Sequence, residues 1–372
     1  MCVIALGKPF SNLPGYGLSM IFYRMSGSSD TAGGATDSRK AATGRTVDDN
    51  TGSTIGALAR QIDALAFADR ARVSRKTLRN VGFALAVYAI VLIGIVTFVV
   101  PRWSGTAVDT TTTFIPTIVI AAFLFETFDS ASGMGFGATL GALLFVLGYP
   151  AAAVVPTLLF SEAATGLVGG LFHNEFKNVE FGFGDESATE ATRILGLVVV
   201  IGVAATVVSV VLAYLAIEVS GPLVQAYIGI IIVFIAGLTL FQNIADFSGT
   251  YSQRQLIGFA ALAGLNKGIT GSGFGPVITL GQILSGIYEK SATAITSMSE
   301  GVVSLAGIIT FLTITVAGVG LDLTLLPSVF AGGFLAAIFA PYTVRVMPNR
   351  ILQYIVPGYA LILAATLFAD IL

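Results

Sequence analysis

The sequence predicts an all-helical, multi-pass integral membrane protein built from two homologous halves. Hydrophobic residues make up 55% of the 372-residue chain and charged residues only 11%, whereas about 25% of the residues in a typical soluble protein are charged. Two similar glycine clusters, at 133–137 and 271–275, interrupt long apolar stretches. We therefore expect a repeat, inverted in the membrane, whose glycine-broken half-helices meet near the bilayer midplane.

The N-terminal segment, residues 1–80, differs in charge from the rest of the chain. It holds 11 Lys/Arg and 6 Asp/Glu, against 8 and 15 in the remainder. Residues 26–54 are small and polar, so residues 1–80 are expected to be a largely disordered tail. The sequence leaves open whether translation starts at Met1 or Met25. Apolar residues at helical spacing over 55–70 predict an amphipathic helix on the membrane surface, although an ordinary solvated helix fits the same pattern.

The first apolar span covers residues 81–100, which as a helix would be about 30 Å long and would cross a bilayer. Basic residues immediately precede it, and the positive-inside rule therefore places the N-terminus in the cytoplasm. Further apolar segments follow near residues 150–172, 193–217, 222–242, 291–316, 323–344 and 351–369. The stretches 114–149 and 255–287 are longer, and each has a glycine cluster near its middle.

The two longer stretches resemble each other. Aligning 122–169 with 260–307, without a gap, gives 11 identities in 48 positions, among them a Ser-Glu pair that occurs as Ser161-Glu162 and Ser299-Glu300. We assign residues 81–218 to repeat 1, 219–348 to repeat 2 and 349–372 to an extra C-terminal helix. Nine crossings with parallel repeats, or eleven membrane segments with inverted hairpins, both fit; we favour the second.

The glycine clusters are candidate binding sites. Irregular backbone survives at membrane depth only inside protein or beside a water-filled cavity, and the exposed N–H groups that begin a half-helix attract anions. Glycine spacing at i, i+2 and i+4 favours this interpretation over close helix packing, which small residues also serve. The glycines are Gly133, Gly135 and Gly137, then Gly271, Gly273 and Gly275.

Ionisable residues inside apolar segments are candidates for binding or coupling. The alignment of the two halves places Lys267 at the position of Asp129, so the two side chains either neutralise each other or leave Lys267 free for an anion. Glu162 and Glu300 are candidates for coupling or gating, because a buried carboxylate can bind a proton near neutral pH; capping of helix amides is the alternative. Glu126 has no counterpart in the second half and is expected near an interface.

Several classes of protein are excluded or disfavoured. The chain has one cysteine and one histidine, too few for a Cys/His metal cluster, and it has no phosphate-binding loop. The protease-like "GFGD" at 182–185 lies in an acidic loop rather than in an apolar span. We therefore expect a transporter rather than an enzyme, with no cofactor or nucleic acid. The oligomeric state stays open.

The order of motifs in both halves resembles one known family. The first half reads "ASGMGFGATLGALLFVLGYPAAAVVPTLLFSEAATGLVGGLFHNEFKNVEF" (131–181), and the second reads "GITGSGFGPVITLGQILSGIYEKSATAITSMSEGVVSLAG" (268–307). Each has a glycine-rich break, an apolar segment, a turn and a further helix. In this order the chain is similar to the sulfite exporter (TauE/SafE) family over residues 81–372. It departs from the family in its acidic loop after His173 and in the residues Met134 and Ser272 between its glycines.

The resemblance implies transport of a small sulfur-containing or organic anion, such as sulfite, thiosulfate, sulfoacetate or another organosulfonate, across the cytoplasmic membrane. The glycines of both clusters would hold the anion, with polar contacts from Ser132, Lys267, Thr270 and Ser272. Glu162, Glu300 and Asp129 would serve coupling or gating. A passive anion channel, or a membrane subunit whose polar residues only join helices, remains the alternative.

Overall fold

A computed structural model describes residues 56–104, 114–182, 189–213, 221–244, 251–315 and 322–369. Every regular element in these ranges is a helix, as the sequence predicts. Five of these helices are long and apolar enough to cross a membrane. The predicted tail up to residue 55 lies outside the described residues.

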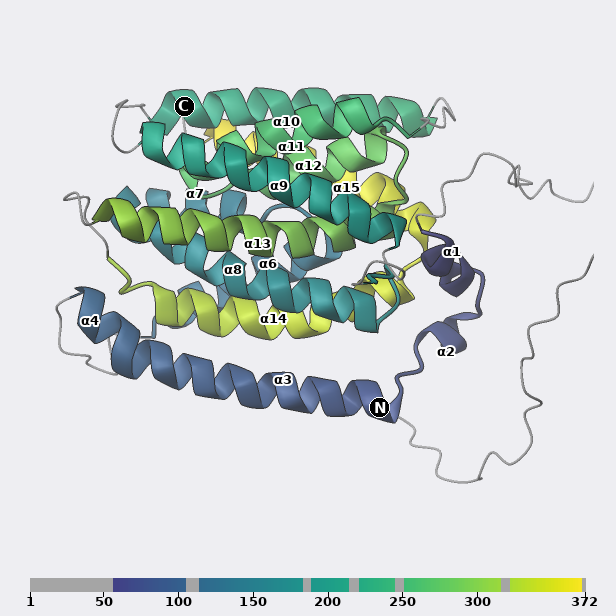
Figure 1. Ribbon diagram of the computed structural model, residues 1–372, viewed down its shortest axis with the longest axis horizontal. Helices are drawn as coiled ribbons and strands as arrows, with labels where there is room; N and C mark the ends of the chain where they lie inside the picture. The colour runs from purple at the N-terminus through teal and green to yellow at the C-terminus, as the bar shows by residue number, and fades with distance from the viewer. Residues whose placement is uncertain are drawn as a thin grey trace, which may run out of the picture. The chain divides into compact units, whose positions relative to one another are not determined.

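The helices run back and forth between two ends of a bundle (Figure 1). The first long helical run consists of α3 (Arg75–Gly94), η1 (Ile95–Val99) and α4 (Val100–Ser104), which follow one another without a gap. The side chain of Ser74 caps α3 by accepting a hydrogen bond from the Thr77 amide. The later long helices are α6 (Pro116–Ser132), α8 (Ala151–Glu175), α9 (Glu190–Val211), α10 (Gly221–Ile244), α11 (Gln253–Thr270), α13 (Glu289–Thr315), α14 (Leu326–Val346) and α15 (Asn349–Ala369).

The stretch predicted to be one amphipathic helix is divided. It forms α1 (Ala57–Asp63) and α2 (Phe67–Arg70), separated by three residues. Ala66, which lies between the two helices, has extended backbone angles, and these interrupt the helix. Leu65 and Phe67 beside the break are 42% and 64% exposed.

One end of the bundle, here called the α1 end, gathers the start of α3 and the ends of α8 and α14. Thr77 donates to Glu175 over 2.7 Å. Tyr342 donates to the Ala71 carbonyl over 2.8 Å, and Arg345 donates to the Phe176 carbonyl over 2.9 Å. These contacts tie the first helices to the body of the bundle.

The opposite end, here called the α4 end, gathers the start of α6 and the start of α14, where the Ile115 amide donates to Ser328 over 2.9 Å. Ile118 of α6, Leu144 of α7 (Gly141–Val146) and Ala153 of α8 share one apolar cluster there. Because α6 starts and α7 ends at the same end, the chain turns back between them. The turn contains the first glycine cluster.

The second glycine cluster also lies in a turn. The helix α12 (Phe274–Leu284) follows α11 after three residues, and a Cβ on Gly281 would lie 2.5 Å from Phe259 Cβ. Residues well before and well after the turn are therefore in contact, so α12 runs back along α11. Since α13 then starts at the α1 end, this pair opens toward the α1 end and the α6–α7 pair toward the α4 end.

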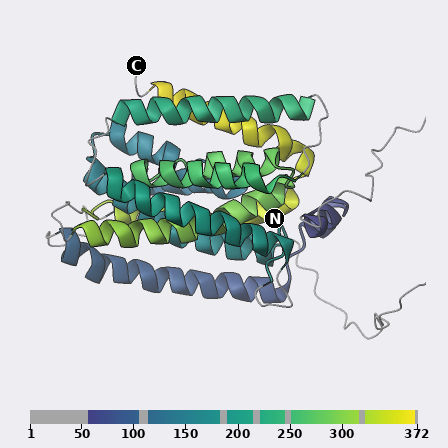
Figure 2. The same cartoon turned by 45° about the horizontal axis from the view of Figure 1, so that its top comes forward.

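The centre of the bundle is the pair α8 and α13, which pack along each other. Around this pair, α14 packs on α6 and α8, while α9 packs on α11 and α13. In both views α3 and α10 lie at opposite edges (Figures 1 and 2). Side chains of α6, α8, α11 and α13 that face the centre are consequently shielded from solvent and lipid.

Candidate functional site

The two glycine segments touch at the centre of the bundle. Gly133 and Gly271 follow the ends of α6 and α11 with φ of 73° and 70°, which a side chain rarely tolerates. A Cβ on Gly275 would lie 2.9 Å from the Gly133 carbonyl oxygen, and a Cβ on Gly137 would lie 2.9 Å from the Ser272 Cβ. Glycine is therefore required both for the turns and for the close approach of the two segments.

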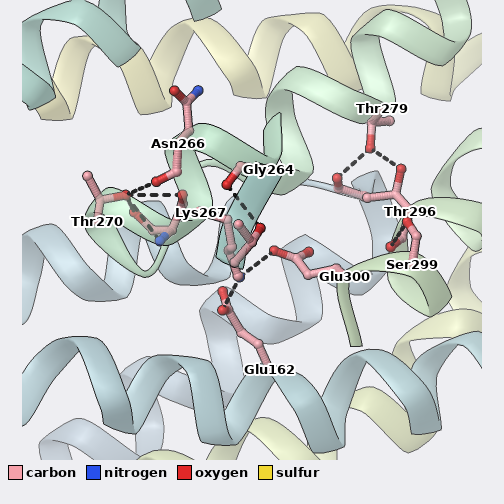
Figure 3. Close-up of polar contacts among 12 residues, drawn as sticks. Glu162, Gly264, Asn266, Lys267, Thr270, Thr279, Thr296, Ser299 and Glu300 are labelled. Atoms are coloured by element: carbon pink, nitrogen blue, oxygen red, sulfur yellow. Dashed lines mark hydrogen bonds and ion pairs between the residues drawn. The ribbon is translucent and has the colours of Figure 1, made fainter. Parts of the chain in front are cut away.

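Beside this contact, Lys267 is held between two carboxylates (Figure 3). Its ammonium donates to Glu162 of α8 and, over 2.9 Å, to Glu300 of α13. The lysine is 0% exposed, and the glutamates are 2% and 6% exposed. With all three groups ionised the cluster carries one net negative charge, in surroundings where uncompensated charge is costly.

The same carboxylates lie at the starts of the helices after the glycines. Glu162 accepts a hydrogen bond from the Gly137 backbone amide, and Glu300 Oε2 would lie 3.4 Å from a Cβ on Gly275. A helix start carries partial positive charge, which favours a nearby anion. The geometry thus gives the glutamates a capping role as well as an ion pair with Lys267.

Asp129 takes a different partner. Its carboxylate accepts a hydrogen bond from the Phe136 backbone amide, and Lys267 forms its ion pairs with Glu162 and Glu300. The sequence left open whether Lys267 and Asp129 neutralise each other. The structure instead pairs Lys267 with the two glutamates. Equivalent positions in two halves need not be neighbours in space.

The hydroxyl groups of the predicted site close the helix ends. Ser132 donates to the Phe128 carbonyl over 2.7 Å and to the Met134 carbonyl over 3.1 Å. Thr270 donates to the Asn266 and Ser272 carbonyls over 3.0 and 3.1 Å. In this structure both hydroxyls satisfy main-chain groups that the end of a helix leaves without partners.

Sequence reasoning missed a set of polar residues on α12 and α13. The Thr279 hydroxyl lies 2.5 Å from the Gly133 carbonyl oxygen and 2.8 Å from the Thr296 hydroxyl. Gln282 donates to Thr296 over 2.8 Å. The available signal was the hydroxyl-rich run "SATAITSMS" at 291–299, whose members are buried.

Glu126 of α6 is buried inside the bundle, with 2% of its surface exposed. Ser130 donates to its Oε1 over 2.8 Å, while Oε2 has no hydrogen-bond partner. Nearby, His173 Nε2 lies 3.0 Å from the Ser130 carbonyl oxygen, and Asn178 Nδ2 lies 3.0 Å from His173 Nδ1. These contacts fix the loop after α8 onto α6.

The fold and the buried charges define a multi-pass membrane protein with a polar centre. The model of the sulfite exporter TauE/SafE family matches residues 118–367, which include both glycine segments and all three members of the Lys267 cluster. The chain belongs to this family, which implies a membrane transporter of sulfite or related anions. No curated protein and no solved structure matches the chain.

Proposed function

We propose that this protein is a proton-coupled secondary transporter of a small sulfur-containing anion, such as sulfite, thiosulfate, sulfoacetate or another organosulfonate. The observation that carries the proposal is Lys267, a cation with no exposed surface, held by Glu162 and Glu300 beside the contact of the two glycine segments. Ionisable residues placed inside a membrane domain mark substrate and ion pathways.

The charges suggest how coupling works. While both glutamates are ionised, the cluster has a net negative charge and repels an anion. A proton on either glutamate neutralises the cluster and frees an ammonium hydrogen of Lys267 for the substrate. Anion and proton would then occupy the site together, since each makes binding of the other more favourable.

The anion would be held by backbone amides and by short polar side chains. The glycines of both clusters carry no side chain that would block a ligand from their backbone amides once the two segments separate, and the starts of the following helices attract negative charge. Ser132, Thr270 and Ser272 would exchange their main-chain hydrogen bonds for the substrate. Asp129 would act in gating, because its carboxylate lies at the start of the helix after the first glycine segment.

We further propose that residues 81–218 and 219–348 are inverted repeats with residues 349–372 as an added helix. The opposite openings of the α6–α7 and α11–α12 pairs support this. So does the packing, because α6 and α8 share α14 just as α11 and α13 share α9. Inverted repeats with discontinuous helices are a common design for alternating access.

The α1 end is placed in the cytoplasm, on the inner side of the cell membrane. Six basic residues lie next to membrane helices at that end: Arg72, Arg75, Lys76, Arg79, Arg345 and Arg350. Positive charge of this kind next to a span favours the cytoplasmic side. This orientation would leave the α6–α7 pair open to the outside.

The test is uptake of radiolabelled sulfite, thiosulfate and a small organosulfonate into liposomes containing the purified protein, with and without a pH gradient. We expect saturable uptake that the gradient accelerates. Lys267→Gln should abolish it, whereas the same substitution at the exposed Lys76 should not. Uptake that neither saturates nor responds to the gradient would indicate a passive channel. Loss of folding in Lys267→Gln, with no flux of any anion in the parent, would indicate a structural subunit.

A further inference from the structure

A second cluster of charges lies at the α1 end, outside the proposed transport site. Asp63 of α1 accepts hydrogen bonds from the Tyr288 hydroxyl over 2.5 Å and from Lys290 Nζ over 2.6 Å. Arg70 Nη1 lies 3.5 Å from the same carboxylate. Three donors of different kinds therefore converge on the two oxygens of one carboxylate.

The cluster has more positive than negative charge. Lys290 is 1% exposed and Arg70 is 9% exposed, and Arg345 donates to the Arg70 carbonyl over 2.7 Å. The Nε and Nη1 atoms of Arg70 have no hydrogen-bond acceptor. Lys290 and Arg70 share Asp63 as their acid. The cluster therefore holds more buried hydrogen-bond donors than this one carboxylate uses.

The remaining groups around the cluster do not remove this excess. Arg60 adds a cation 5.1 Å above the Tyr288 ring, while Glu289 adds an acid that accepts from Asn349 over 2.7 Å. Burial and the hydrogen bond to Asp63 raise the pKa of Tyr288. Its hydroxyl therefore stays a donor across the physiological range.

The helix that carries Asp63 borders a cavity. The cavity, of about 220 Å³, is lined by the start of α1 and by residues 179–180 and 189–191. The contacts of Asp63 hold α1 together with the buried Ala59, which is 1% exposed, and with the hydrogen bond from Arg345 to the Arg70 carbonyl. Tyr288 lies between α12 and α13, and Lys290 lies in the first turn of α13, the helix that also carries Glu300.

We propose that Tyr288, Lys290 and Arg70 form an oxyanion-binding site that the chain's own Asp63 fills. Residues 56–70 would then be a plug at the α1 end, which a free small oxyanion releases by displacing Asp63. Carboxylate, sulfite and sulfonate groups all present negatively charged oxygens that accept charge-assisted hydrogen bonds from ammonium and guanidinium donors. The site needs no transport activity in order to bind its ligand.

Chemical rescue tests the site directly. Asp63→Ala removes the carboxylate and leaves space, so the thermal unfolding midpoint of the purified protein should fall by several degrees, and added formate or sulfite should restore much of it. Asp63→Asn keeps the space filled and should gain nothing from the anions. In Asp63→Ala with Lys290→Gln, rescue should be lost. Chloride at equal ionic strength is the control. Equal rescue in all variants, or no fall in Asp63→Ala, would overturn the proposal.

Release of the plug is measured by cysteine labelling. Ala59, which lies on α1 and is 1% exposed, is changed to Cys in a Cys2→Ser background. Maleimide should label this cysteine at least about tenfold faster in Asp63→Asn, because charge-assisted hydrogen bonds of Asp63 are lost. Sulfite should accelerate labelling of the parent but not of Lys290→Gln. Unchanged labelling with anion would show that the segment is a fixed anchor and would overturn the plug.

Discussion

The two glycine segments have similar backbones and different chemistry. Corresponding positions in the two halves share a positive φ: Gly135 and Gly273 have φ of 122° and 78°, and Gly148 and Gly286 have φ of 87° and 85°. The side chains around the segments differ. The second segment is preceded by Lys267, and the first by Asp129 at the corresponding position.

The central helices differ in the same way. Thr293 and Thr296 of α13 correspond to Val155 and Leu158 of α8, which belong to apolar clusters. The polar groups that contact Gly133 therefore come from one side of the bundle. The comparison teaches that the turns with positive φ recur on both sides, whereas the cation and its hydroxyl-rich surroundings occur once.

The largest expected difference between the two segments is in stability. Lys267→Met leaves two buried carboxylates without their cation and should lower the free energy of unfolding by about 3–5 kcal/mol. Asp129→Asn removes a charge but keeps a hydrogen-bond acceptor and should lose about 1 kcal/mol. Denaturation of both variants in detergent, with exposed Lys76→Met as control, measures this. Equal losses would show that the two positions are energetically equivalent.

A smaller difference is expected for the glycines at the crossing. A Cβ on Gly275 would meet the Gly133 carbonyl oxygen at 2.9 Å and Met134 Cα at 3.1 Å, which are backbone atoms. Gly275→Ala should therefore lower stability by about 1–3 kcal/mol. Gly137→Ala displaces mainly the Glu162 carboxylate and should lower anion uptake more than stability. Unfolding midpoints and liposome uptake of both variants check this; the reverse order would contradict it.

The smallest effect is expected at Gly148, in the turn after α7. Gly148 has a positive φ but nothing within 4 Å of an added Cβ, so Gly148→Ala should cost only about 1–2 kcal/mol of backbone strain. Gly196 has equally open space inside α9, and Gly196→Ala should stabilise by up to about 1 kcal/mol. Thermal unfolding compares them. Destabilisation by both would contradict the assignment of the difference to backbone conformation.

Much of the fold is encoded locally and could be predicted. Apolar segments long enough to cross a bilayer define the helices, and glycines at alternate positions mark where α6 and α11 end. The division of residues 55–70 into α1 and α2 could not be predicted from the apolar spacing, which continues through the break. The repeat remains a prediction from sequence identity that the paired packing supports.

The sequence by itself determined the class of protein and nominated the residues of the candidate site, because composition, hydropathy and glycine spacing act over short stretches of chain. Only the tertiary structure decided which of these residues meet. Lys267 reaches Glu162 across 105 positions, and Thr279 reaches Gly133 across 146. These contacts depend on the close crossing of α8 and α13, where a Cβ on Gly166 would lie 2.6 Å from the Gly301 amide nitrogen. Helix packing of this kind is set by the whole bundle, so no local pattern predicts it.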